Sequence, residues 1–242
     1  MLLRLTLEYV GTEFHGWARQ PGLRTVEGVL GEGLDRVFPA WSRLHVAGRT
    51  DAGVHALAQV VSLEADGGPP PEHAAEALNT VLPHDVAVVA AAEAPPGFHA
   101  RFSALSRSYR YRIDRRATPS PFEARRSWWL PQPLDEERLH AAAALLPGEH
   151  DFRAFTPTET QHEVFVRVVE RAEWRRAGDA LEFEITADSF LRHMVRTLVG
   201  TMVDLGPEEL GELLEGAPRE RAGRTAPPQG LYLIGVAYDQ ER

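Results

Sequence analysis

Hydrophobic residues recur along this chain with two different periods, and each period predicts a type of secondary structure. Near the start, Leu3, Leu5 and Leu7 alternate with polar residues, as expected of a strand with one buried face. After a possible cap at Thr25, apolar residues return every three or four positions up to Val37, which predicts an amphipathic helix. Further elements are predicted as a strand over 57–63, a helix over 72–82 and a strand over 85–91. We interpret the first hundred residues as β-α-β-β-α-β, with one of the two middle strands not assigned to particular residues.

The second half of the chain repeats this order. The predicted elements are a strand over 108–113, a helix over 135–146, strands over 164–175 and 181–186, a helix over 190–205 and a strand over 231–238. The helix over 190–205 has the clearest apolar stripe, and Asp188 and Ser189 are available to cap its start. Pro- and Gly-rich segments over 67–71 and 217–230 are interpreted as loops.

This repeated order predicts an α+β fold made of two ferredoxin-like (βαββαβ) subdomains. Each has an antiparallel sheet with helices packed on one side, and a cleft is expected between the two. We place the division between residues 1–104 and 105–242.

Composition agrees with a soluble globular protein and excludes several kinds of chemistry. Of the 242 residues, 43% are hydrophobic and 25% are charged, which is average for such proteins. No apolar run approaches the roughly 20 residues of a membrane span, and the start shows no signal-peptide core, so a cytoplasmic protein without membrane contact is expected. With no cysteine, the chain has no disulfide, thiolate nucleophile or cysteine-ligated metal site.

Charge is unevenly distributed. The net charge of −9 argues against indiscriminate nucleic-acid binding, yet all 26 basic residues are arginine and eight of them lie within residues 101–126 against two acids. This segment carries 8 − 2 = +6. Arginine suits bidentate phosphate contacts and stacking on bases, so the segment is compatible with RNA binding, although an arginine-only repertoire is also explained by genome composition.

The densest group of chemically active residues is Gly48-Arg49-Thr50-Asp51-Ala52-Gly53-Val54-His55. Two glycines flank Asp51 in a loop that leads into a strand, so its carboxylate can be presented on a tight turn. Arg49 and Thr50 could pair with this carboxylate or hold a phosphate beside it. Local composition alone is also satisfied by an ordinary Asp-Ala-Gly turn.

Five segments of the chain, in order, resemble those of the tRNA pseudouridine synthase A family. They are Tyr9 to Gln20 with Phe14-His15-Gly16-Trp17; Gly48 to Ala56; Phe98 to Ala104 with Tyr109-Arg110-Tyr111; Arg192 to Arg196 with Leu198-Val199-Gly200; and Pro228 to Leu233. The resemblance spans nearly the whole chain. One departure is Glu27 in Thr25-Val26-Glu27-Gly28, where the family usually has glutamine.

The resemblance implies an isomerase that converts uridine to pseudouridine without a cofactor or a metal. Asp51 matches the family's nucleophile, and Arg196 matches the arginine set against it. Tyr109 matches a tyrosine that packs on the flipped base, for which stacking of about 1–3 kcal/mol is of the right size. Whether Asp51 attacks the ribose C1′, attacks uracil C6 or removes a ribose proton stays open.

The resemblance also implies the substrate and the assembly. It points to tRNA positions 38, 39 and 40 in the anticodon stem-loop and to a homodimer that grips one tRNA. Shape recognition through phosphates is expected, with the segment from Arg107 to Arg116 as the candidate grip. The candidate substrate-binding residues are Tyr109, His55, Arg107, Arg110 and His193, and the candidate catalytic residues are Asp51, Arg49 and Arg196.

Two other functions remain as alternatives. One is a non-catalytic RNA-binding module on the same fold, which would not need Asp51. The other is a metal-dependent phosphohydrolase that uses Asp51, His45 and His55. The scattered histidines His15, His55 and His193 are plausible RNA contacts but lack the spacing of a metal site.

Overall fold

The structure, a computed structural model, describes residues 1–160 and 162–239 and consists of two compact units. Unit 1 comprises Met1–Leu105 and the C-terminal segment that begins at Leu233, and unit 2 comprises Ser106–Tyr232. The division lies one residue after the position expected from the sequence. The return of the C-terminal segment to unit 1 was not foreseen, because sequence order alone assigns a last strand to the subdomain that precedes it.

Unit 1 has the expected β-α-β-β-α-β order. Its elements are β1 (Leu2–Tyr9), α1 (Val26–Val37), β2 (Ala40–Val46), β3 (His55–Asp66), α2 (Pro71–Asn79) and β4 (Val86–Glu93), with a 3-10 turn η1 (Gly11–Glu13). In the hydrogen-bonded strand order β1 lies between β4 and β3, antiparallel to both, and β2 pairs with β3. The last strand, β10 (Leu231–Tyr238), is the other neighbour of β3.

The alternation seen in the sequence positions the core of unit 1. Leu3, Leu5 and Leu7 on β1 are fully buried, as are Leu30 on α1 and Leu78 on α2. The predicted cap of α1 is confirmed, because the Thr25 side chain accepts a hydrogen bond from Gly28 N at 3.2 Å. Burial of these side chains holds α1 and α2 to the sheet.

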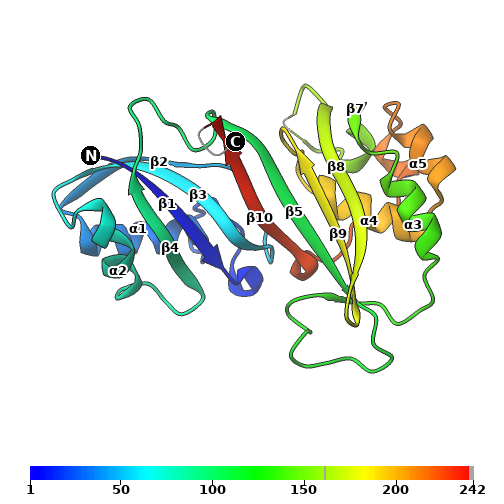
Figure 1. The fold of residues 1–242 in the computed structure, drawn as a ribbon, viewed down its shortest axis with the longest axis horizontal. Coiled ribbons are helices and arrows are strands. Elements are labelled where there is room, and N and C mark those ends of the chain that lie inside the picture. The colour runs from blue at the N-terminus through cyan, green and yellow to red at the C-terminus, as the bar shows by residue number, and fades with distance from the viewer. Residues whose placement is uncertain (161, 240–242) are drawn as a thin grey trace. The chain divides into compact units, whose positions relative to one another are not determined.

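Unit 2 contains more elements than the sequence predicted. They are β5 (Ala104–Asp114), β6 (Trp128–Trp129), α3 (Glu136–Ala143), β7 (Gly148–Asp151), η2 (Arg153–Phe155), β8 (Val166–Ala177), β9 (Ala180–Ala187), α4 (Met194–Asp204), α5 (Pro207–Leu213), η3 (Arg219–Arg221) and η4 (Pro228–Gly230). The strand order is β5-β9-β8-β7, antiparallel throughout, and β6 pairs in parallel with β5. In each unit the helices lie on one side of the sheet (Figure 1).

The fold class is confirmed, with corrections to individual elements. The short elements β6, β7 and α5 were not predicted, no residues had been assigned to β2, and α4 begins at Met194 rather than at residue 190. Asp188 does not cap this helix: its Oδ1 accepts from Ser189 N at 2.6 Å and from Val168 N at 3.2 Å. His193, in the left-handed conformation with φ 63°, precedes the first helical residue instead. Within residues 1–160 and 162–239, no helix is both long enough and apolar enough to cross a membrane.

Candidate active site

The loop that carries Asp51 is anchored to β1 and β3 by buried hydrogen bonds. The hydroxyl groups of Tyr9 and Thr50 lie 2.8 Å apart, and Gln59 Nε2 donates to Gly48 O at 2.7 Å. Gln59 Nε2 also lies 3.3 Å from the Tyr9 hydroxyl oxygen, so one buried network joins both strands to the loop. Burial raises the pKa of Tyr9 to about 12, which keeps its hydroxyl protonated at neutral pH.

The opposite side of the loop is held by the segment that follows β1. Trp17 N donates to Thr50 O at 3.0 Å, Gly53 N donates to Phe14 O at 3.2 Å, and Gly11 N donates to His55 Nδ1 at 3.0 Å. Gly11 lies so close to the backbone of the loop that a methyl group added to it would overlap the carbonyl oxygen of Val54. The backbone on either side of Asp51 is therefore fixed by bonds from two directions.

Exposure alternates along this loop in a way that suits a reactive carboxylate. Arg49 and Ala52 are exposed and Thr50 is buried, while Asp51 is half-buried. Gly53 has a φ of 80°, a conformation that favours glycine, and closes the turn after Ala52. The Asp51 side chain thus reaches the surface from a loop whose neighbouring positions serve as anchors.

An ion pair supports the segment that packs on this loop. Arg24 donates to both carboxylate oxygens of Asp85, at 2.7 and 2.8 Å, and its guanidinium carbon lies 4.0 Å from the centre of the Phe14 ring. The hydrogen bonds and charge of Arg24 hold the pKa of Asp85 below its usual value. Phe14 in turn accepts the bond from Gly53 described above, so this pair supports the loop indirectly.

Glu27, the one departure from the family pattern, has a defined structural role. Its Oε2 accepts a hydrogen bond from Arg19 N at 2.7 Å. A glutamine side chain offers an acceptor oxygen at the same position. The carboxylate also lies in the first turn of α1, where a negative charge is favoured by the helix dipole.

In unit 2 the tyrosine predicted to stack on the base packs against a phenylalanine that the sequence analysis did not select. The centres of the Tyr109 and Phe190 rings are 4.9 Å apart in an edge-to-face arrangement, and Tyr109 is 8% exposed. Arg107, on the same strand, donates from a terminal guanidinium nitrogen to Asp188 O at 2.9 Å. Phe190 was interpreted only as the start of a helical apolar stripe, and the sequence offered no further reason to choose it.

Arg196 lies on the first turns of α4 and is held by the segment that precedes β10. Its Nε donates to Ala226 O at 2.8 Å, and Ala226 N donates back to Arg196 O at 3.0 Å. The neighbouring Tyr111 hydroxyl donates to Pro227 O at 2.8 Å. Burial raises the pKa of Tyr111, and the positive charge of Arg196 opposes this shift.

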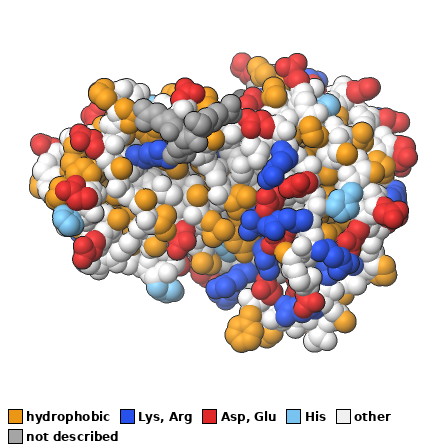
Figure 2. Space-filling model, viewed as in Figure 1, with side chains coloured by type: hydrophobic (Ala, Val, Ile, Leu, Met, Phe, Trp, Pro, Cys, Tyr) orange, Lys and Arg blue, Asp and Glu red, His pale blue; other side chains and the backbone are white. Residues whose placement is uncertain are grey.

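Arginines of β5 that were expected to contact RNA are engaged in an ionic network on the sheet. Arg110 binds Glu184 at 2.8 Å and Arg112 binds Glu182 at 2.8 Å, while Arg175 on β8 binds both glutamates. Burial raises the pKa of Glu184, but the hydrogen bond and charge of Arg110, together with Arg175, outweigh it and the pKa is lowered. Figure 2 shows the arginine and acidic side chains interleaved over β5, β9 and β8.

The structure brings together some of the predicted residues. Arg49 and Asp51 lie in one loop of unit 1 and His55 begins β3 directly after it, whereas Tyr109, Arg107, Arg110, His193 and Arg196 belong to unit 2. His55 is 2% exposed, and its Nδ1 accepts a hydrogen bond from Gly11 N. Its side chain therefore stabilises the loop from the protein interior. The ion pair between Asp51 and Arg196 and the cleft between the subdomains stay predictions.

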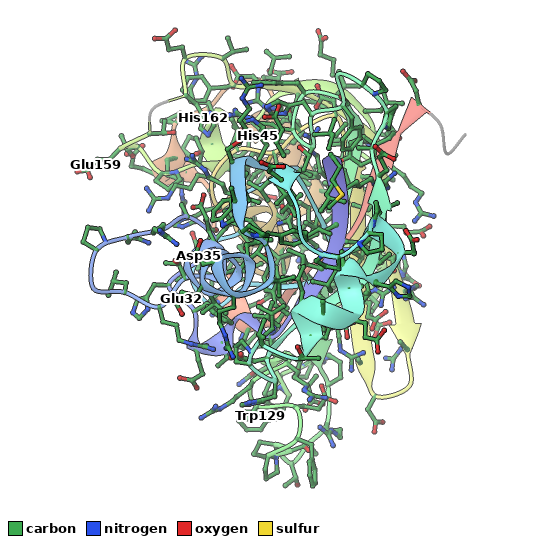
Figure 3. The ribbon with its side chains drawn as sticks, turned by 90° about the vertical axis from the view of Figure 1, so that its left-hand side faces the viewer. Glu32, Asp35, His45, Trp129, Glu159 and His162 are labelled. Atoms are coloured by element: carbon green, nitrogen blue, oxygen red, sulfur yellow. The ribbon has the colours of Figure 1, made fainter. Side chains whose placement is uncertain are left out.

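The residues of the phosphohydrolase alternative have other contacts. The ring of His45, labelled in Figure 3, stacks on that of His99 with centres 4.0 Å apart. His55 Nδ1 already accepts the bond from Gly11. In the part of the chain that the structure describes, no group of three or more His, Cys, Asp or Glu side chains could hold a metal ion.

Comparisons with known proteins agree with the motifs. A family model described as tRNA pseudouridine synthase matches residues 6–103 and 142–239. "tRNA pseudouridine synthase A" of Gloeobacter violaceus is 42% identical over 99% of this chain and 81% of its own length. The protein of the same name from Moorella thermoacetica is 42% identical over 98% of this chain and 99% of its own. The chain therefore belongs to the tRNA pseudouridine synthase family.

Proposed function

We propose that this chain isomerises uridine to pseudouridine in tRNA, with Asp51 as the nucleophile. The observation that carries the proposal is the half-buried Asp51 carboxylate on a loop whose backbone is hydrogen-bonded from both sides. A reactive group must be held in one geometry while it stays accessible, and this loop meets both needs. Membership of the family supports the assignment.

The reaction needs no redox carrier. The bond between uracil N1 and ribose C1′ breaks, the base turns, and a new bond forms between C5 and C1′. C5 loses its hydrogen as a proton and N1 gains one, so atoms and electrons balance. Attack of Asp51 on C1′, attack on C6, and removal of a ribose proton all fit this balance.

Unit 2 supplies the groups proposed to assist Asp51. Arg196 pairs with the Asp51 carboxylate and keeps it ionised, because a neighbouring positive charge favours the charged form of an acid. The Tyr109 ring, oriented by Phe190, stacks on the flipped uracil. Arg49, exposed beside Asp51, holds a phosphate next to the target nucleotide.

The substrate and assembly follow the family resemblance. We propose the anticodon stem-loop, at positions 38, 39 and 40, as the place of modification, and a cytoplasmic homodimer as the working form. The relatives carry tRNA in their names, which supports this substrate class.

Release of tritium tests the proposal, because the hydrogen on C5 leaves in the reaction. Unmodified tRNA labelled with 5-³H-uridine is incubated with wild-type protein, Asp51→Asn and Asp66→Asn in excess EDTA. Asp66 is an exposed aspartate at the end of β3 and serves as the matched control. We expect release by wild type and Asp66→Asn and none by Asp51→Asn.

Other outcomes identify the alternatives. Release by Asp51→Asn at the wild-type rate would remove the proposed nucleophile. No release by wild-type protein, together with retained tRNA binding, would favour the RNA-binding module. Loss of wild-type release in EDTA, restored by a divalent metal, would favour metal-assisted chemistry.

A further inference from the structure

The segment over residues 115–127, between β5 and β6, forms a long excursion from unit 2 that we call the β5–β6 loop (Figure 1). At its tip Phe122 is 87% exposed, more than any other large hydrophobic side chain in the described parts of the chain. The loop contains four arginines and one acid, Glu123, and so carries 4 − 1 = +3. Trp129, labelled in Figure 3, lies just after the loop in β6.

Exposure of Phe122 is not the result of an unstructured loop. Phe122 N donates to Ser120 Oγ at 3.2 Å, Ala124 N donates to Ser120 O at 3.0 Å, and Ser127 Oγ donates to Glu123 O at 3.1 Å. These local bonds form a turn that holds the ring away from the protein. An exposed ring on an ordered turn, with the exposed Arg125 and Arg126 close by in the sequence, presents a face on which an external partner can stack.

The base of the loop is fastened to the rest of unit 2. The Tyr232 hydroxyl donates to Arg126 O at 2.5 Å, and Trp129 Nε1 donates to Arg116 O at 2.9 Å. Arg112 on β5 reaches Glu123 at 3.4 Å, which draws the only acid of the loop toward the strand. The loop is thereby organised before any partner binds.

The loop arginines differ from those of the neighbouring strand. Arg110 and Arg112 face the buried carboxylates of Glu184 and Glu182, whereas Arg125 and Arg126 at the end of the loop are exposed. The loop therefore adds exposed positive charge close to Phe122 in the sequence. The arginine cluster seen in the sequence therefore contains two groups. One group pairs with glutamates on the sheet, and the other is exposed in the loop.

We propose that the β5–β6 loop is a tRNA contact in which Phe122 stacks on an unpaired base while Arg125 and Arg126 hold adjacent phosphates. The proposal rests on the proposed tRNA substrate. An aromatic ring stacks on any base, and arginine matches phosphate geometry, so the combination fits RNA that is partly unpaired. The excess of four arginines over one acid in the loop favours a polyanionic partner over a protein surface of mixed charge.

Affinity for tRNA tests the loop without depending on turnover. Binding of a fluorescently labelled, unmodified tRNA is measured by anisotropy at several salt concentrations, in an Asp51→Asn background that prevents conversion. Loss of one stacking contact predicts about tenfold weaker binding for Phe122→Ala, with an unchanged salt slope. Arg125→Ala and Arg126→Ala should each reduce the salt slope by about 1, whereas Arg138→Ala, an exposed arginine of α3, leaves it unchanged.

Two conservative replacements distinguish stacking from other uses of an apolar side chain. Phe122→Trp should restore affinity, and its added fluorescence should be quenched by tRNA. Phe122→Leu keeps the apolar surface but not the π-face, and should bind as weakly as Phe122→Ala. If leucine instead restored binding, or if Phe122→Ala changed only the sedimentation of the free protein, the loop would be a protein-docking surface and the proposal would be overturned.

A Phe122→Ala variant that binds tRNA with wild-type affinity would also overturn the proposal that the β5–β6 loop contacts tRNA. Failure of the proposed function is a separate result, because absence of tritium release by the wild-type protein leaves the affinities and salt slopes of the loop variants measurable.

Discussion

The hydroxyl groups of Tyr9 and Thr50 lie 2.8 Å apart in a buried hydrogen bond, one residue before Asp51. The bond joins the end of β1 to the loop that carries the proposed nucleophile. Because Gln59 reaches both the Tyr9 hydroxyl and Gly48 O, these three side chains form one network beneath the loop. The position of Asp51 thus depends on buried side chains beneath its loop.

Replacement of Tyr9 by phenylalanine should impair turnover as well as stability. The change leaves the buried Thr50 hydroxyl without its partner, which costs about 1–2 kcal/mol in the free energy of unfolding. It also loosens the loop, so kcat should fall about tenfold while Kd for tRNA stays within threefold. Urea denaturation and tritium release measure the two effects.

Tyr238→Phe is the matched control for this prediction. The Tyr238 hydroxyl donates to Ala100 O at 2.7 Å, and its ring is buried like that of Tyr9. The ring belongs to the core cluster that contains Ala47, but its hydroxyl bonds to a residue outside the Asp51 loop. We expect a similar loss of stability with unchanged kcat. Equal kcat values in the two variants would mean that the Tyr9 bond does not position Asp51.

Most of the fold could be predicted because hydrophobic periodicity records which face of an element is buried. The Leu3-Leu5-Leu7 alternation and the Thr25 cap both correspond to observed elements. The start of α4 was misplaced because Asp188, a good capping residue, is used by Ser189 and Val168 instead. Tertiary contacts of this kind leave no trace in local sequence.

The candidate site was predicted less completely, and for a physical reason. The sequence identified Asp51 as the candidate nucleophile. It could not indicate that the His55 side chain faces inward and accepts a hydrogen bond from Gly11 N. It also could not separate the arginines that pair with buried glutamates, such as Arg110, from those exposed in a loop, such as Arg126. Pairing across strands depends on register, which only the folded sheet reveals.

Gly11→Ala should distort the loop that carries Asp51. A methyl group there overlaps the backbone carbonyl of Val54, and a backbone atom cannot move aside as a flexible side chain can. Overpacking of this kind costs about 1–3 kcal/mol and should displace the Asp51 loop. We expect a lower Tm and a kcat reduced more than tenfold.

Gly22→Ala provides the comparison for Gly11→Ala. Gly22 has a φ of 72°, yet nothing lies within 4 Å of the added carbon, so alanine there causes only backbone strain of about 1 kcal/mol. Its kcat should match that of wild type. A wild-type kcat in Gly11→Ala as well would show that the loop tolerates displacement from this side.

The Arg24–Asp85 ion pair should make stability depend on pH in the acidic range. The pKa of Asp85 is lowered in the folded protein by its bonds to Arg24, so the unfolded chain takes up a proton first as the pH falls. The stability from this pair is fully present above the unfolded pKa of about 4 and is lost as the pH falls through the lower, folded value.

Asp85→Asn should therefore be less stable than wild type at pH 7, by about 1 kcal/mol for a partly exposed pair. The difference should shrink below about pH 4. Urea denaturation of both proteins between pH 3 and pH 7 gives the two curves. A difference that stays constant down to pH 3 would show that Asp85 acts through packing and not through its charge.

Tyr109 should affect turnover far more than tRNA affinity. The ring is 8% exposed and is oriented by its edge-to-face contact with Phe190, so complete truncation to alanine would also cost several kcal/mol of core packing. Leucine fills more of the space than alanine but lacks both the π-face and the hydroxyl group. If the ring stabilises the flipped uracil, Tyr109→Leu should lower kcat about 10- to 100-fold, the equivalent of one stacking contact, and change Kd less than threefold.

Tyr109→Phe separates the ring from its hydroxyl, and Phe190→Leu separates the ring from its support. The first variant should keep near-wild-type turnover, because phenylalanine retains the stacking face. The second should lower kcat less than Tyr109→Leu, because the tyrosine remains but is less well oriented. If Tyr109→Leu instead weakened kcat and tRNA affinity by the same factor, the ring would contribute to the general structure of unit 2, and stabilisation of the flipped base would have to come from another residue.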